Sequence, residues 1–145
     1  MGILDNKVAV VTGVGSGIGK AISMAFADEG ASLGVGDISE DLLSKTTQDL
    51  KNKSTNITSI TTDVSSEEEV KKLIDETVNA YGKLDIIVNN VSVAIGGYPI
   101  TDMSNEDWQK IIGINFSSVF YGCKHSIPHL KKNNGGSIIN IASVQ

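Results

Sequence analysis

The residues best suited to chemistry form a glycine-rich stretch at residues 12–19, with the sequence Thr-Gly-Val-Gly-Ser-Gly-Ile-Gly. Glycine has no Cβ, so the backbone N–H groups of such a stretch can approach an anion closely. An apolar run precedes it at residues 8–11, and an amphipathic stretch begins near Ile18. A strand that turns through glycine into a helix directs the positive N-terminus of that helix at a ligand above the turn. The pattern therefore predicts a phosphate-binding loop.

The spacing of the glycines narrows the choice of ligand. A strict G-x-G-x-x-G pattern would need glycine at position 18, where the chain has Ile18, and the spacing that fits is T-G-x-x-x-G-x-G. Asp37 ends a second predicted strand, 18 positions past Gly19, where a carboxylate that binds a ribose is expected. A flexible turn would also be rich in glycine. The strand, the helix and the carboxylate together favour a dinucleotide site.

The composition of the 145 residues excludes several classes of partner. The net charge is −5, so no basic stripe is available to replace counterions on nucleic-acid phosphates. No segment approaches the roughly 20 apolar residues of a membrane span, and residues 1–7 lack the pattern of a signal peptide. The single cysteine, Cys123, fits a reducing compartment. We expect a cytoplasmic protein with no nucleic-acid or membrane partner.

Continuous apolar runs alternate along the chain with stretches in which apolar residues recur at helical spacing. Strands are predicted at residues 7–12, 32–37, 57–62, 84–89 and 137–142, each preceded or followed by a helical pattern. This alternation is typical of βαβ units with right-handed crossovers. The sequence predicts one α/β domain over residues 1–145, a Rossmann-type parallel sheet of five strands with helices on both faces. Ligands of such sheets bind beyond the carboxyl ends of the strands, which is where we expect Gly13, Asp37, Asp63, Asn89, Asn90 and Ser143.

The predicted helices bury apolar side chains and one amide. The helix at residues 39–53 is expected to face Leu42, Leu43 and Leu50 inward, and the long helix from Ser104 to face Trp108 inward. Asn115 lies in the apolar stripe of that long helix. An unpaired buried amide would cost about 1–3 kcal/mol, so this side chain must have a partner.

Two further patterns have simple structural explanations. The acidic residues 67–69 follow Ser65 and Ser66, which favours a helix start over a metal site. His125 and His129 are four residues apart, but no cysteine or carboxylate completes a zinc set locally. Pro128 is expected to interrupt the helix between them. No metal site is predicted.

Together these residues resemble the short-chain dehydrogenase/reductase family over essentially the whole chain. The matching segments occur in the family's order and spacing: residues 12–19, Asp37, Asp63-Val64, Asn89-Asn90-Val91-Ser92, Asn115 and residues 136–143. One departure is at Val91-Ser92, where the family commonly has Ala-Gly and where larger side chains would crowd the ribose.

The resemblance implies a nicotinamide cofactor. Asp37 would bind the adenosine ribose hydroxyls and repel a 2′-phosphate, and neither Ser16 nor Ile38 supplies the cation of an NADP site, so NAD is expected rather than NADP. Asp63 and Val64 would flank the adenine. Asn89 would brace the central strands near the cofactor, and Val91 would lie beside it. The pyrophosphate and adenosine ribose would be held by Gly13, Ser16, Gly17, Ile18 and Gly19.

The resemblance also implies two catalytic residues. Ser143 would donate a hydrogen bond to the substrate oxygen, and Asn115 would hold a water of a proton relay. Without the resemblance, Ser143 is an ordinary loop serine, or a cap for the next helix, and Asn115 an amide bonded only to neighbouring backbone. The family's Tyr-x-x-x-Lys base would follow Ser143, but the sequence ends at Gln145, and no tyrosine in it is followed four residues later by lysine.

These implications lead to two hypotheses. The first is an NAD-dependent oxidoreductase that transfers hydride between nicotinamide and a secondary alcohol or ketone, with its catalytic Tyr and Lys outside these 145 residues. The complete enzyme would be a homo-oligomer. The sheet predicted for these 145 residues would be incomplete at its C-terminal side, with an open edge at the last strand. The alternative is a non-catalytic dinucleotide-binding module or an inactive truncated member of the family.

Overall fold

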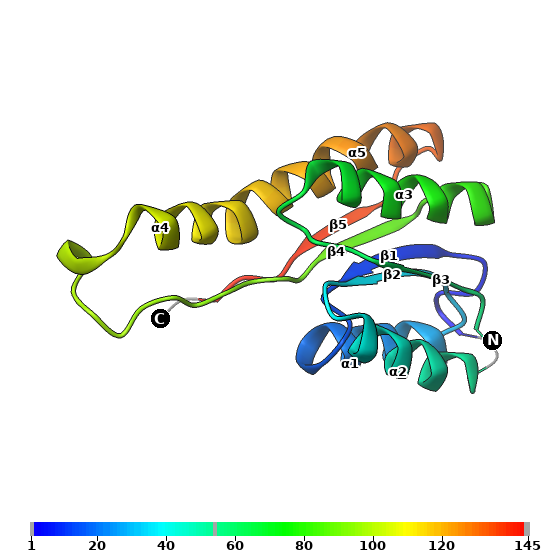
Figure 1. Cartoon of the computed structure of the whole chain (residues 1–145). Coiled ribbons are helices and arrows are strands. Elements are labelled where there is room, and N and C mark those ends of the chain that lie inside the picture. The colour runs from blue at the N-terminus through cyan, green and yellow to red at the C-terminus, as the bar shows by residue number, and fades with distance from the viewer. Residues whose placement is uncertain (1, 54, 144–145) are drawn as a thin grey trace.

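The apolar runs form a parallel sheet in the computed structural model, which describes residues 2–53 and 55–143. The strand order within the described residues is β3-β2-β1-β4-β5, with the crossovers expected of βαβ units (Figure 1). The five-stranded prediction is confirmed, although several strands are shorter than expected. Their bounds are β1 (Val8–Thr12), β2 (Ser32–Asp37), β3 (Ile57–Thr61), β4 (Ile86–Asn89) and β5 (Ser137–Asn140).

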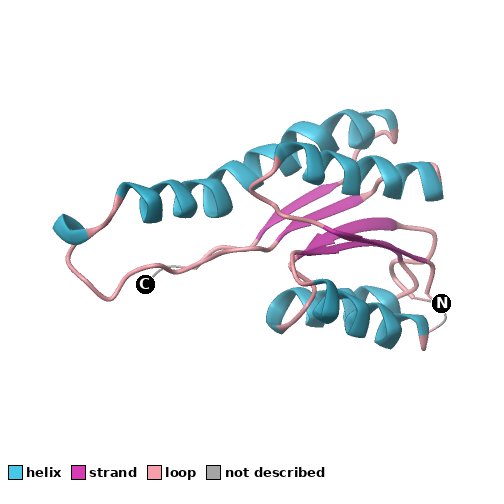
Figure 2. Cartoon of the chain, viewed as in Figure 1, coloured by secondary structure: helices cyan, strands magenta, loops and turns pink. Residues whose placement is uncertain are grey.

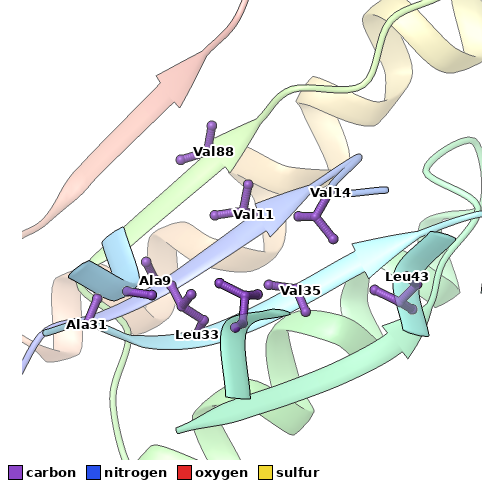
Figure 3. Packing of buried hydrophobic residues seen from close by; sticks show 10 residues of the cluster. Ala9, Val11, Val14, Ala31, Leu33, Val35, Leu43 and Val88 are labelled. Atoms are coloured by element: carbon purple, nitrogen blue, oxygen red, sulfur yellow. The ribbon is translucent and has the colours of Figure 1, made fainter. Parts of the chain in front are cut away.

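Helices cover both faces of the sheet, as the alternating pattern predicts. Helices α1 (Gly17–Asp28) and α2 (Glu40–Lys51) lie on one face, and α3 (Glu67–Tyr81) and α5 (Ser118–Lys132) lie on the other (Figure 2). All five residues of β1 are buried, because the central strand is covered from both sides. Alternate β1 residues therefore enter different cores. Ala9 and Val11 pack with Leu33 and Val35 on the α1 side (Figure 3), whereas Val10 packs on the α3 side.

The long helix expected from Ser104 is less regular than predicted. It consists of α4 (Asn105–Ile111), a π-helical segment η2 (Ile112–Ser117) and α5, after a short 3₁₀ turn η1 (Ile100–Asp102). Helix α4 extends away from the sheet (Figure 1), and Trp108, expected to face inward, is 48% exposed. An amphipathic stripe does not reveal whether the sheet continues beneath it.

Two other helical expectations are wrong. Pro128 does not interrupt α5, which continues to Lys132. Proline removes one helical hydrogen bond, the one to the carbonyl of Lys124, and both Pro128 and Lys124 lie on the exposed side of α5. Leu42 is 40% exposed because the buried side of α2 is formed by Leu43, Thr46, Thr47 and Leu50.

Strand β5 forms an edge of the sheet among the described residues, as expected. Ile139 in this strand is 38% exposed. Within the described residues, none of the helices combines the length and the apolar character that crossing a membrane requires.

Candidate functional site

The loop between β1 and α1 turns beside the end of β2. Gly13 has a φ of 70° and Gly17 a φ of 55°, a left-handed backbone that glycine adopts without strain. The N–H groups of Gly13 and Val14 both donate to the carbonyl of Gly36, at 2.7 and 3.3 Å. These bonds tie the loop to the carboxyl end of the neighbouring strand.

Gly19 brings the first turn of α1 directly onto the loop. A Cβ at this position would lie 2.0 Å from the carbonyl oxygen of Gly13 and 2.5 Å from Asn90 Nδ2, so no side chain fits. Asn90 Nδ2 itself donates to the carbonyls of Thr12 and Gly13, at 3.0 and 3.2 Å. Val91 also lies against Gly13, since its Cγ2 would be 2.8 Å from a Cβ there. The end of β4 thus supports the glycine loop.

The N-terminus of α1 is electrostatically different from those of the next three helices. Ser16, its N-cap residue, makes no side-chain capping bond, and its first turn holds no acidic residue. In α2, α3 and α4, serine side chains cap the helix and acidic residues occupy the first turn. Ser16, Gly17 and Ile18 are exposed. The free N–H groups and the positive end of α1 therefore face solvent without compensation, which suits an anionic group.

Asp37 presents a fixed carboxylate beside this helix start. Its Oδ2 accepts a hydrogen bond from Gly15 N at 2.8 Å, and its Oδ1 accepts one from Ser39 N at 2.9 Å. The side chain is half-buried, and none of the ion pairs found in residues 2–53 and 55–143 involves it. A carboxylate oxygen can accept more than one hydrogen bond, so Asp37 retains acceptor capacity for a ligand hydroxyl.

Asp63 follows β3 and shapes the neighbouring part of the rim. Its Oδ1 accepts bonds from the N–H and hydroxyl of Ser65, at 2.9 and 2.7 Å. Glu69 Oε2 accepts from Asp63 N at 2.7 Å, so this acid reaches past the helix cap, Ser66, to brace the strand end. Val64 is buried in the core on the α3 side. All three acidic residues of the triplet lie in the first turn of α3, as their sequence context predicts.

Asn89 joins the ends of β4 and β5. Its Nδ2 donates to Asn140 Oδ1 at 2.8 Å, and its carbonyl accepts from Ile141 N at 2.9 Å. Gly122 on α5 lies so close that a Cβ there would be 2.0 Å from Asn89 Oδ1. These contacts hold the segment that leads to Ser143, which is exposed beyond the end of β5.

Asn115 lies in the π-helical segment and bonds to backbone. Its Oδ1 accepts from Val93 N, and its Nδ2 donates to the Val93 carbonyl, both at 2.8 Å. The two polar ends of the amide are therefore paired with one residue of the loop after β4. This arrangement anchors that loop to the helix, and the relay role of Asn115 stays a prediction.

Comparison with known proteins identifies the family of this arrangement. The family model described as short chain dehydrogenase matches residues 7–145. The chain belongs to this family. Its curated relatives include 3beta-hydroxysteroid dehydrogenase 2 of Eggerthella lenta, 34% identical over 98% of this chain and 55% of the relative. Another is the 3-oxoacyl-(acyl-carrier-protein) reductase of Thermotoga maritima, 33% identical over 97% of this chain and 57% of the relative.

Solved structures of other dehydrogenases share the fold. A Burkholderia phymatum member in complex with NAD has a TM-score of 0.93 and 35% identity, covering 99% of this chain and 51% of that one. NAD⁺-bound xylitol dehydrogenase has a TM-score of 0.92 and 30% identity, covering 97% of this chain and 54% of that one. The present chain spans about half the length of the relatives it matches.

The two histidines are bound to carboxylates. His125 Nε2 lies 2.9 Å from Glu67 Oε1, and His129 Nε2 lies 3.4 Å from Asp75 Oδ1. Hydrogen bonds from Lys124 and His125 lower the pKa of Glu67. In the part of the chain that the structure describes, no three histidine, cysteine or acidic side chains gather as a metal site would require.

The structure adds residues to the site that the motif spacing does not mark. Gly15 is a free position in T-G-x-x-x-G-x-G, yet it contacts Asp37. Asn140 and Val93 are the partners of Asn89 and Asn115. Gly15 and Asn140 lie inside the matching segments 12–19 and 136–143, and Val93 directly follows Asn89-Asn90-Val91-Ser92, but the spacing assigns no role to any of the three.

Proposed function

We propose that this chain forms the dinucleotide-binding half of an NAD-dependent short-chain dehydrogenase/reductase. The observation that carries the proposal is the Asp37 carboxylate, held at the end of β2 by the N–H groups of Gly15 and Ser39. A carboxylate in this place accepts hydrogen bonds from the ribose hydroxyls of NAD and repels the 2′-phosphate of NADP. The NAD-bound relative of 35% identity supports the same cofactor.

The residues of the rim fit such a cofactor. The uncapped start of α1 would receive the pyrophosphate, and a Cβ at Gly19 would fill the space where helix and loop meet. Asp63 and Val64 would flank the adenine, and Asn89 and Val91 would support the cofactor from β4. The residues proposed to hold the pyrophosphate and adenosine ribose are Gly13, Ser16, Gly17, Ile18 and Gly19.

The proposed reaction is hydride transfer between the nicotinamide and a secondary alcohol or ketone, and the bound cofactor supplies the hydride chemistry. Ser143 would donate a hydrogen bond to the substrate oxygen. Asn115 would hold a water of a proton relay, and its two bonds to Val93 also fix the loop that begins at Val91. A base must still take the hydroxyl proton, and these 145 residues contain no Tyr-x-x-x-Lys.

The second candidate is a module that binds the dinucleotide without turnover. For the complete enzyme we propose a homo-oligomer in the cytoplasm. The large exposed side chains of Trp108, Phe116 and Phe120 on α4, η2 and α5 support association, because such groups commonly mark protein interfaces.

Titration of the chain with NADH and NADPH tests the proposal. The unaltered chain is expected to bind NADH more tightly, and Asp37→Ser to weaken NADH binding by about tenfold or more, since hydrogen bonds to a charged group contribute about 1.5–3 kcal/mol. Asp41→Ser, which removes an equal charge from an exposed position on α2, is the matched control. An unchanged preference in Asp37→Ser would show that Asp37 is not the ribose ligand. Turnover of an alcohol by this chain would contradict the binding-module candidate.

A further inference from the structure

Gly15 is a glycine that the backbone torsion does not require. Unlike Gly13 and Gly17, it does not have a positive φ. The space around it is nevertheless closed, since a Cβ would lie 2.8 Å from Leu42 Cβ and 2.9 Å from Asp37 Oδ2. A glycine at position 15 is therefore needed for the close approach of the loop to the end of β2 and the start of α2.

The same residue holds the Asp37 carboxylate through its backbone. Gly15 N donates to Asp37 Oδ2 at 2.8 Å, while Ser39 N holds the other oxygen at 2.9 Å. Ser39 is also the N-cap of α2, and its side chain accepts from Leu42 N at 3.4 Å. The loop, the carboxylate and the start of α2 thus form one closed set of contacts.

A side chain at position 15 would have to displace one of these neighbours. Leu42 Cβ is attached directly to the helix backbone, so it moves only if α2 moves. The Asp37 carboxylate is the end of a side chain and can rotate away more readily. The consequence of adding a methyl group at Gly15 is therefore a displaced carboxylate and a lost N–H bond.

We infer that Gly15 determines cofactor specificity by positioning Asp37. Its N–H group fixes the carboxylate that distinguishes ribose hydroxyls from a 2′-phosphate, and its lack of a side chain leaves room for that carboxylate. The inference rests on the proposed function, in which Asp37 binds the ribose. Gly15 thereby connects the phosphate loop to nucleotide selection, although the glycine motif treats it as a free position.

Dissociation constants for NADH and NADPH, measured on Gly15→Ala, Asp37→Ser and the double variant, test this inference. Gly15→Ala is expected to raise the dissociation constant of NADH about tenfold, which corresponds to about 1.4 kcal/mol. The dissociation constant of NADPH is expected to change much less. The double variant is expected to have the same ratio of NADH to NADPH affinity as Asp37→Ser alone, because the effects of two coupled residues on binding are not additive. Gly113→Ala is the matched control, since a Cβ there would lie 3.6 Å from Ser65 Cβ, an ordinary contact.

The outcomes separate this inference from the proposed function. Suppose that the unaltered chain binds NADH more tightly than NADPH and that Asp37→Ser reduces this difference in affinity. If Gly15→Ala then weakens the binding of both nucleotides equally, or of neither, only the inference is overturned. If the unaltered chain binds neither nucleotide, the proposed function and the inference both fail. Should Gly15→Ala not fold, hydrogen exchange of the Gly15 amide decides: exchange at least about tenfold faster in Asp37→Ser supports the bond, and equal exchange refutes it.

Discussion

Asn115 offers a sharp test of how the loop after β4 is held. In Asn115→Asp, the oxygen that accepts from Val93 N is retained, but the N–H donor to the Val93 carbonyl becomes an oxygen. The variant loses one hydrogen bond and leaves two acceptors facing each other at a half-buried site. A lost bond contributes about 0.5–1.5 kcal/mol and an unsatisfied buried acceptor about 1–3 kcal/mol, so we expect a loss of about 2–4 kcal/mol at pH 7.

Thermal unfolding followed by circular dichroism measures this loss. An unfolding entropy of about 2.1 cal/mol/K per residue gives about 0.3 kcal/mol/K for a chain of this length, so the expected drop in Tm is about 7–13 °C. Asn79→Asp is the control: it adds the same charge at an exposed position in the last turn of α3, where the unfavourable interaction with the helix C-terminus should cost at most about 1 kcal/mol.

The pH dependence makes the test specific for the hydrogen bond. The carbonyl of Val93 disfavours the ionised form, so the introduced carboxyl has a folded pKa above its unfolded value of about 3.9. Its destabilisation is complete above the folded pKa and disappears as the pH falls toward about 4, because the protonated acid donates to Val93. A variant as stable as the Asn79→Asp control at pH 7, or a deficit that does not shrink at low pH, would refute the reasoning.

Two further substitutions test contacts that support the site and the sheet. Gly19→Ala places a methyl group 2.0 Å from the Gly13 carbonyl oxygen, so urea unfolding should show a free energy of unfolding about 1–3 kcal/mol lower than that of Gly113→Ala. Equal stability of the two variants would contradict the close approach. Asp85→Asn should cost about 1–3 kcal/mol at pH 7, because the buried carboxylate accepts from Val8 N and Asn133 Nδ2, both at 2.9 Å. Burial alone would raise the pKa of Asp85, but these bonds and Lys83 lower it, so the stabilisation is present above about pH 4 and lost as the pH falls through the lowered pKa. A deficit in Asp85→Asn that is unchanged at low pH would show that ionisation of Asp85 does not stabilise the fold.

Local patterns were sufficient to predict the sheet but not the outer helix. Continuous apolar runs such as Val8–Thr12 specify buried parallel strands, and the alternation with helices determines their connection. Trp108 was expected inside because a helical stripe records only which side of a helix is apolar. What lies opposite that side depends on contacts between distant segments, which a periodic pattern does not encode.

The glycine loop shows the same limit within the site itself. Spacing identifies Gly13, Gly17 and Gly19, two of which have a positive φ, a requirement that belongs to the local chain. Gly19 and Gly15 are needed instead for space, and the atoms that fill this space belong in part to Asn90, Asp37 and Leu42, which are distant in sequence. A motif records the spacing that a turn requires, whereas close approach depends on what the fold places beside the turn. The residue that connects phosphate binding to nucleotide selection is for this reason visible only once β2 and α2 are packed against the loop.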